Sequence, residues 1–118
     1  MYRWVIADGF LPASSSGMFE SHESLCLVNP HNRDAEVVLH VFFEDRPPLE
    51  GIMLTCPAKR TRHIRVNTLH DAAGRTIPVG EPYALELVCD VELGVQLSRL
   101  DTSQAQMALM TVAGIRID

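Results

Sequence analysis

The feature that most constrains how this chain can fold is a repeated short alternation of apolar and polar residues, interrupted at close intervals by turn residues. Strand side chains point alternately to two faces, so a two-residue period is typical of β-strands, and no long stretch shows the 3.6-residue period of a helix. The 118 residues are about one domain in size. We therefore predict one all-β domain over residues 1–118. The expected strands are Arg3–Ala7, Glu23–Val28, Ala35–Phe43, Gly51–Cys56, Arg60–Val66, Tyr83–Cys89, Val95–Leu100 and Met107–Ile115.

The segments between these strands are rich in the Gly, Pro, Asn and Asp residues that turns require, and the longest lies between Asp71 and Pro82. One helical signal occurs. Asp101 is a good helix N-cap with Gln104 three residues later, although the run that follows is equally good strand. We expect one turn of helix after Leu100 and then the last strand.

Composition argues against several classes of protein. No apolar run is long enough for a membrane span or for the hydrophobic part of a signal peptide, so we expect a cytoplasmic protein without membrane insertion. A net charge of −5 disfavours non-specific nucleic-acid binding, because phosphates attract a surplus of Lys and Arg. Cys26, Cys56 and Cys89 lie in apolar runs without metal-ligand or disulfide-framework spacing, and we expect buried thiols.

The expected strand Ala35–Phe43 is apolar on both faces. Val37, Leu39 and Val41 share one face, while Val38 and Phe42 flank His40 on the other. A second apolar face is usually covered, and in so small a chain the simplest cover is another subunit. The alternative is that Val38 and Phe42 merely flank a solvated histidine.

Parity also places polar residues at the ends of inward-pointing rows. If Leu25 and Leu27 face the core, Ser21 and Glu23 lie on the same side and His22 points away. The same reasoning puts Asp8, Arg62 and Arg99 at the ends of inward rows. Because an inward charge is costly unless it is paired, we expect Glu23 or Asp8 to meet Arg99 or Arg62. These groups either line a binding pocket or only close the sandwich with buried ion pairs.

The sequence lacks the usual motifs of metal and nucleophilic chemistry. The histidines are scattered without ligand spacing: His22, His31, His40, His63 and His70. Ser21 and His22 are neighbours in sequence, so their side chains leave opposite faces of a strand and cannot form a catalytic pair. There is no Gly-rich phosphate loop. We expect no cofactor, no metal and no catalytic residue.

Basic residues are concentrated in the segment KRTRHIR, Lys59–Arg65. Such a strand can contact phosphate, carboxylate or nucleic acid, or it can be a solvated edge strand whose charges discourage aggregation. We expect at most weak nucleic-acid binding that is lost at physiological salt.

Four blocks of the sequence together resemble the sensory rhodopsin transducer family. They are Trp4 with the DGFLP segment that follows it, SHES-x-C-x-VN (Ser21–Asn29), PAKRTRHIRVNTL (Pro57–Leu69) and SRLDTSQAQMALM (Ser98–Met110). The resemblance runs almost the whole length, although Asp8 departs from the family's usual Glu and the Asp71–Pro82 loop has no clear counterpart. It implies an antiparallel, jelly-roll-like β-sandwich of about eight strands that assembles as a homotetramer.

The resemblance also implies a function. One member of the family works beside a photoreceptor, and the wider family resembles small-molecule-binding domains, sugar-related ligands among them. We therefore expect a non-enzymatic domain that binds a small polar or anionic ligand or transduces a signal; a photoreceptor partner does not follow for every member. Parity and resemblance together give these ligand-binding candidates: Trp4, Asp8, Ser21, His22, Glu23, Arg60, Arg62, His63, Arg65, Asn67, Arg99 and Asp101.

Two other functions remain open on the sequence. The first is a nucleic-acid or protein adaptor that uses the basic strand Lys59–Arg65. The second is a small enzyme with Glu23 or Asp101 as general base, but no second catalytic partner stands at a recognisable spacing.

Overall fold

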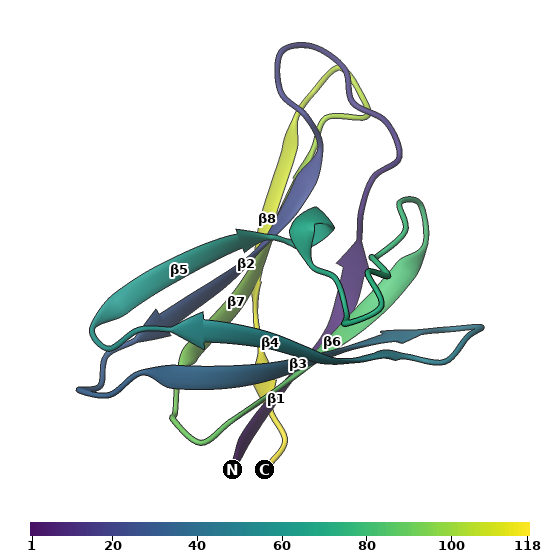
Figure 1. The fold of residues 1–118 in the computed structure, drawn as a ribbon. Helices are drawn as coiled ribbons and strands as arrows, with labels where there is room; N and C mark the ends of the chain where they lie inside the picture. The colour runs from purple at the N-terminus through teal and green to yellow at the C-terminus, as the bar shows by residue number, and fades with distance from the viewer.

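A computed structural model describes residues 1–118 and shows two antiparallel sheets facing each other, which confirms the predicted all-β sandwich (Figure 1). The strands are β1 (Tyr2–Phe10), β2 (His22–Asn29), β3 (Ala35–Phe43), β4 (Leu49–Cys56), β5 (Arg60–Arg65), β6 (Pro82–Cys89), β7 (Gly94–Asp101), β8 (Ala108–Ala113) and β9 (Ile115–Arg116). One 3₁₀ turn, η1 (Val66–Thr68), follows β5. The chain contains no helix long and apolar enough to cross a membrane.

The first sheet has the strand order β4-β3-β6-β1-β9 and the second has the order β5-β2-β7-β8. Their inner faces supply the core, because the alternation in each strand puts one apolar row between the sheets. Leu25 and Leu97 of the second sheet and Leu39 and Leu87 of the first are all buried there. The predicted inward rows are therefore confirmed for the central strands.

The last expected strand is divided at Gly114, which gives nine strands instead of about eight. Up to Ala113 the chain pairs with β7, and from Ile115 it pairs with β1 of the other sheet. At the crossing, the Gly114 amide donates to the Val95 carbonyl at 2.9 Å. A Cβ at Gly114 would lie 3.0 Å from a methyl group of Val95, so this close crossing favours glycine.

The expected helical turn after Leu100 is wrong. β7 continues through Asp101, and the residues after it form bends. The Asp101 carboxylate accepts a hydrogen bond from the Ser103 amide at 2.9 Å, and the Gln104 side chain donates to the Asp101 and Gln106 carbonyls. These local side-chain bonds compete with the backbone bonds of a helix.

β1 contains an irregularity that matters for the candidate site. Its pairing with β6 shifts register between Ile6 and Gly9. One extra residue in β1 turns Asp8 out to solvent, so the simple alternation from Trp4 and Ile6 fails there. The Tyr83 ring packs over Gly9 so closely that any Cβ at this position would collide with it.

The two faces of β3 differ as the alternation predicts. Val37, Leu39 and Val41 are fully buried, whereas Phe42 on the opposite face is 40% exposed. On that outer face Val38 pairs with Met53 of β4, whose side chain is 62% exposed. Val38, Phe42 and Met53 thus form an apolar patch on the outer face of the first sheet, beside polar pairs such as Thr55 with Glu36, and its coverage by another subunit stays a prediction.

Candidate functional site

Glu23 lies at the centre of a buried polar cluster that includes charged side chains. Its side chain is fully buried among core residues at the start of β2. One carboxylate oxygen accepts hydrogen bonds from the Phe10 amide, at 3.0 Å, and from the Tyr83 hydroxyl. The other accepts from Arg99 Nε at 3.0 Å. The buried carboxylate therefore has a donor on each oxygen.

Three strands bring these groups together. Glu23 and Arg99 are directly opposite each other on the neighbouring strands β2 and β7. Tyr83 comes from β6 of the facing sheet and passes over Gly9, so its hydroxyl reaches across the sandwich. Tyr83 is the member of this cluster that the sequence analysis missed. It ends the inward row of Leu85 and Leu87, which is the signal that selected the charged residues.

Asp8 joins the cluster from the surface. Arg99 Nη2 donates to the Asp8 carboxylate at 3.4 Å and to its backbone carbonyl at 3.3 Å. The expected meeting of Glu23 and Asp8 with Arg99 is thus confirmed as geometry, although the Asp8 side chain is 71% exposed. Arg62 is not part of the cluster: it lies on the edge strand β5 and donates to the Thr55 carbonyl of β4 at 2.7 Å.

Burial dominates the electrostatics of this cluster. It raises the pKa of the Glu23 carboxyl above its ordinary value, although the hydrogen bonds from Tyr83 and Arg99 pull the other way. Burial beside the Glu23 charge also raises the pKa of the Tyr83 hydroxyl. For Arg99 burial acts to lower the pKa, but the bonds and charges of Glu23 and Asp8 outweigh it, so the pKa is raised. The Glu23–Arg99 pair belongs to the second sheet, and the Phe10 amide, the Tyr83 hydroxyl and Asp8 link it to the first sheet.

Ser21 and Thr102 tie two loops together at the same end of the sandwich. The Ser21 hydroxyl donates to the Ser14 carbonyl and accepts from the Thr102 amide, at 2.9 and 2.8 Å. His22 points outward as expected and, with Asn67 and Ser21, lines a small hollow of about 140 Å³. Asp101 organises the adjacent turn. Ser21, His22 and Asp101 thus make local hydrogen bonds, whereas the side chain of Asn67 makes none.

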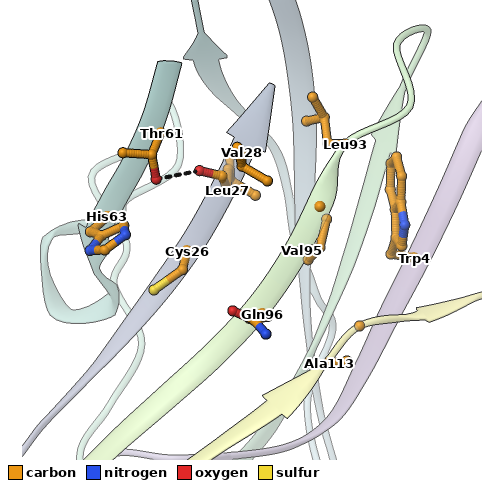
Figure 2. Close-up of a pocket in the computed structure, with 12 residues that line it drawn as sticks. Trp4, Cys26, Leu27, Val28, Thr61, His63, Leu93, Val95, Gln96 and Ala113 are labelled. Atoms are coloured by element: carbon orange, nitrogen blue, oxygen red, sulfur yellow. Dashed lines mark hydrogen bonds between the residues drawn. The ribbon is translucent and has the colours of Figure 1, made fainter. Parts of the chain in front are cut away.

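A larger groove of about 470 Å³ opens on the second sheet (Figure 2). It contains two of the expected residues, Trp4 and His63. Its other lining residues are Cys26, Leu27, Val28, Thr61, Leu93, Gly94, Val95, Gln96, Ala113 and Gly114. No side chain of the Glu23 cluster lines this groove, and Tyr83 borders a separate hollow of about 230 Å³ beside Phe42 and Phe43.

Two glycines shape the groove. Gly94 has no side chain on the outer face, and Val28 leans into that space, where a Cβ on Gly94 would lie 2.5 Å from a Val28 methyl carbon. At Gly114 the chain leaves the second sheet, so β7 has no neighbour on its β8 side beyond this point, and the core near Trp4 is reached from the groove. Neither the packing of Val28 over Gly94 nor the crossing at Gly114 follows from a local sequence pattern, so the groove was not predicted from the sequence.

The polar groups of the groove have free bonding capacity. Figure 2 shows the Thr61 hydroxyl bonded to the Leu27 carbonyl, at 3.1 Å, with His63 and Gln96 on either side of β2. The side chains of His63 and Gln96 make no hydrogen bond within the chain. Over an apolar floor, an imidazole and an amide of this kind can bind a small polar molecule.

The remaining expected residues lie elsewhere. Arg60 bonds only to the Lys59 carbonyl, at 3.1 Å, and Arg65 is exposed opposite Ser24. The twelve candidates therefore do not form one pocket. They divide among the buried Glu23 cluster, the groove, the hollow near His22 and the edge strand β5. No three His, Cys, Asp or Glu side chains lie close enough together to hold a metal ion.

Two packed antiparallel sheets with a buried ion pair and an open polar groove define a small β-sandwich domain. The family model described as Anabaena sensory rhodopsin transducer matches residues 1–115, so the chain belongs to the sensory rhodopsin transducer family. The family expected from the sequence blocks is thereby confirmed.

Two solved structures are similar to this chain. The structure titled Anabaena sensory rhodopsin transducer is 36% identical, with 88% of this chain and 91% of that chain covered and a TM-score of 0.74. The crystal structure of Thermotoga maritima 1070 is 30% identical, with 96% and 91% covered and a TM-score of 0.81. A comparison with curated proteins found no match.

Proposed function

We propose that this chain is a non-catalytic, cytoplasmic signal-transducing domain that binds a small hydroxyl-bearing or anionic ligand in the groove beside His63 and Gln96. The observation that carries the proposal is the contrast in hydrogen bonding. Glu23 has donors on both carboxylate oxygens, whereas the side chains of His63 and Gln96 border a groove without a partner in the chain. Both side chains are exposed, so they are free to exchange bound water for a ligand.

Membership of the family supports the signalling half of the proposal. The relative named as a sensory rhodopsin transducer links this fold to a photoreceptor in that protein. For this chain we propose the same class of role, with the groove as its input site. We also propose the homotetramer, supported by the apolar outer surface around Val38, Phe42 and Met53. Light scattering tests it, and a monomer at micromolar concentration would contradict it.

A thermal-shift panel of sugars, sugar acids, sugar phosphates and small carboxylates tests the groove. A ligand at a hundredfold excess over its Kd adds about 2.7 kcal/mol to the free energy of unfolding, because it binds only the folded state. We expect His63→Ala and Gln96→Ala to abolish the response to a ligand that shifts the parent.

The matched controls are Arg65→Ala, on the same face of β5 but outside the groove, and Gln106→Ala, an exposed amide in the β7–β8 loop. Both should keep the response. A ligand whose shift survives His63→Ala and Gln96→Ala binds elsewhere, and a panel without any shift contradicts the ligand-binding half of the proposal.

A further inference from the structure

The ion pairs of this protein leave one group of cations without carboxylate partners. Of the ten Lys and Arg residues, six form salt bridges: Arg3, Arg33, Arg46, Arg75, Arg99 and Arg116. The other four are Lys59, Arg60, Arg62 and Arg65, all on or beside β5. The carbonyl bonds of Lys59, Arg60 and Arg62 leave their charges uncompensated. An acidic protein therefore concentrates its free positive charge on one strand.

This strand is also an open sheet edge. β5 is the terminal strand of the second sheet, paired on one side with β2 (Figure 1). Its neighbour in the other sheet, β4, is terminal as well. Every β5 residue except Ile64 is exposed. A terminal strand presents a row of backbone N–H and C=O groups that another extended segment can pair with.

An apolar hollow of about 390 Å³ lies between the two open edges. Arg62 borders it, and its apolar wall includes Ile52 and Leu54 of β4 with Ile64 of β5 and Leu69 after η1. These four side chains belong to the core, but they are reached from outside here. An extended segment on this edge can therefore place apolar side chains next to its charged ones.

We propose that β5 is a docking strand for an extended acidic segment of a partner protein, which adds to its free edge as a further strand of the second sheet. The alternation of side chains along β5 determines which residues the bound segment must have. Arg60 and Arg62 share one face and are two residues apart, with Ile64 next in the row. The segment has two carboxylates on alternate residues, followed in the same row by an apolar residue. This site is separate from the ligand groove and does not depend on it.

The observations favour a peptide over nucleic acid. The net charge of −5 disfavours a long polyanion that extends beyond β5, whereas a short acidic segment meets only the cations of this strand. The hollow beside the strand offers no Phe, Tyr or Trp for base stacking, only the His70 imidazole, and its floor is aliphatic. A free strand edge is satisfied by another polypeptide backbone, whereas nucleic acid has no strand to add.

Fluorescence anisotropy tests the proposal with a fluorescein-labelled peptide of alternating Glu and Thr, slightly longer than β5. We expect binding at low salt that weakens as salt increases, and no binding of the matching Lys and Thr peptide. Arg60→Ala combined with Arg62→Ala should weaken binding by about tenfold, because two charge-assisted contacts are lost. The control is Arg3→Ala combined with Arg46→Ala, which changes the net charge equally but lies in the first sheet and its β3–β4 turn, and it should change the affinity by less than about twofold.

Two N-methylated peptides separate strand addition from simple attraction of charge. One is methylated at its Glu amides and the other at its Thr amides; both keep every carboxylate. A strand pairs through alternate residues, so one of the two must fail and the other must bind. The proposal is overturned if both methylated peptides bind, if the two double variants weaken binding equally, or if nothing binds at low salt. Tighter binding of a single-stranded oligonucleotide of equal charge would overturn it in favour of nucleic acid.

Discussion

Arg99 and Arg62 come from the same sheet and were expected in the same role, yet their surroundings are opposite. Arg99 is on the inner strand β7, its side chain is 16% exposed, and it bonds to Glu23 and Asp8. Arg62 is on the edge strand β5, is exposed, and has only a carbonyl partner. The position of the strand in the sheet, rather than the residue type, decides whether a charge is part of the core or is available to a partner.

The largest effect should come from breaking the buried pair. Arg99→Ala leaves the fully buried Glu23 carboxylate without its counter-charge, and we expect a loss of about 3 kcal/mol in the free energy of unfolding, measured by urea denaturation. Arg62→Ala is the matched control and should cost less than about 0.5 kcal/mol. Equal losses would show that the two arginines do not differ as described.

A smaller effect should follow from the hydroxyl that ties the loops. Ser21→Ala removes the acceptor of the buried Thr102 amide, and we expect a loss of about 1 to 3 kcal/mol in the same measurement. Ser98→Ala is the control, because the Ser98 hydroxyl bonds to Thr111 on the exposed outer face. It should lose less than about 0.5 kcal/mol. If Ser98→Ala lowers the free energy of unfolding more than Ser21→Ala does, the hydrogen bonds of Ser21 are not what holds the two loops together.

The pH dependence of stability sharpens the same comparison. Because burial raises the pKa of Glu23 above 4.5, the folded state keeps a proton that the unfolded state has lost as pH rises above 4.5. The free energy of unfolding therefore falls with rising pH in that window, by at most about 1.4 kcal/mol per pH unit. Glu23→Gln should remove this slope, and Glu44→Gln, at an exposed position, should keep it. A parent and a Glu23→Gln variant with parallel profiles would contradict the raised pKa.

The smallest effects are expected on β5. Arg60→Ala and Arg65→Ala break no ion pair and should each change the free energy of unfolding by less than about 0.5 kcal/mol, by urea denaturation. Their near-neutrality would show that these cations are not needed to hold the fold. A loss above 1 kcal/mol from either would assign them a structural role.

Alternation was a reliable guide where strands are central and regular. It put Glu23 and Arg99 at the ends of inward rows, where the structure pairs them, and predicted the inner rows of β2, β3 and β7. It failed for Asp8, because a register shift in β1 interrupts the two-residue period.

The other features of the candidate sites depend on contacts between segments that are far apart in the sequence. Tyr83 was overlooked because it is neutral, although the glycine after Asp8 marks the place where its ring passes. The groove depends on Val28 leaning over Gly94 and on the crossing of the chain at Gly114, and no window of neighbouring residues records either event. Sequence blocks were enough for the family, but they could not divide the twelve candidate residues among separate surfaces.

The partners of β1 set the order in which the sandwich can form on the ribosome. β1 ends at Phe10, but its neighbours in the sheet are β6, which begins at Pro82, and β9. At a synthesis rate of about 5 to 20 residues per second, several seconds pass between the emergence of β1 and that of β6. During that time the row of Trp4 and Ile6 has no sheet to join. The nascent chain is thus accessible to chaperones for seconds, and closure of the first sheet has to wait for the last third of the sequence.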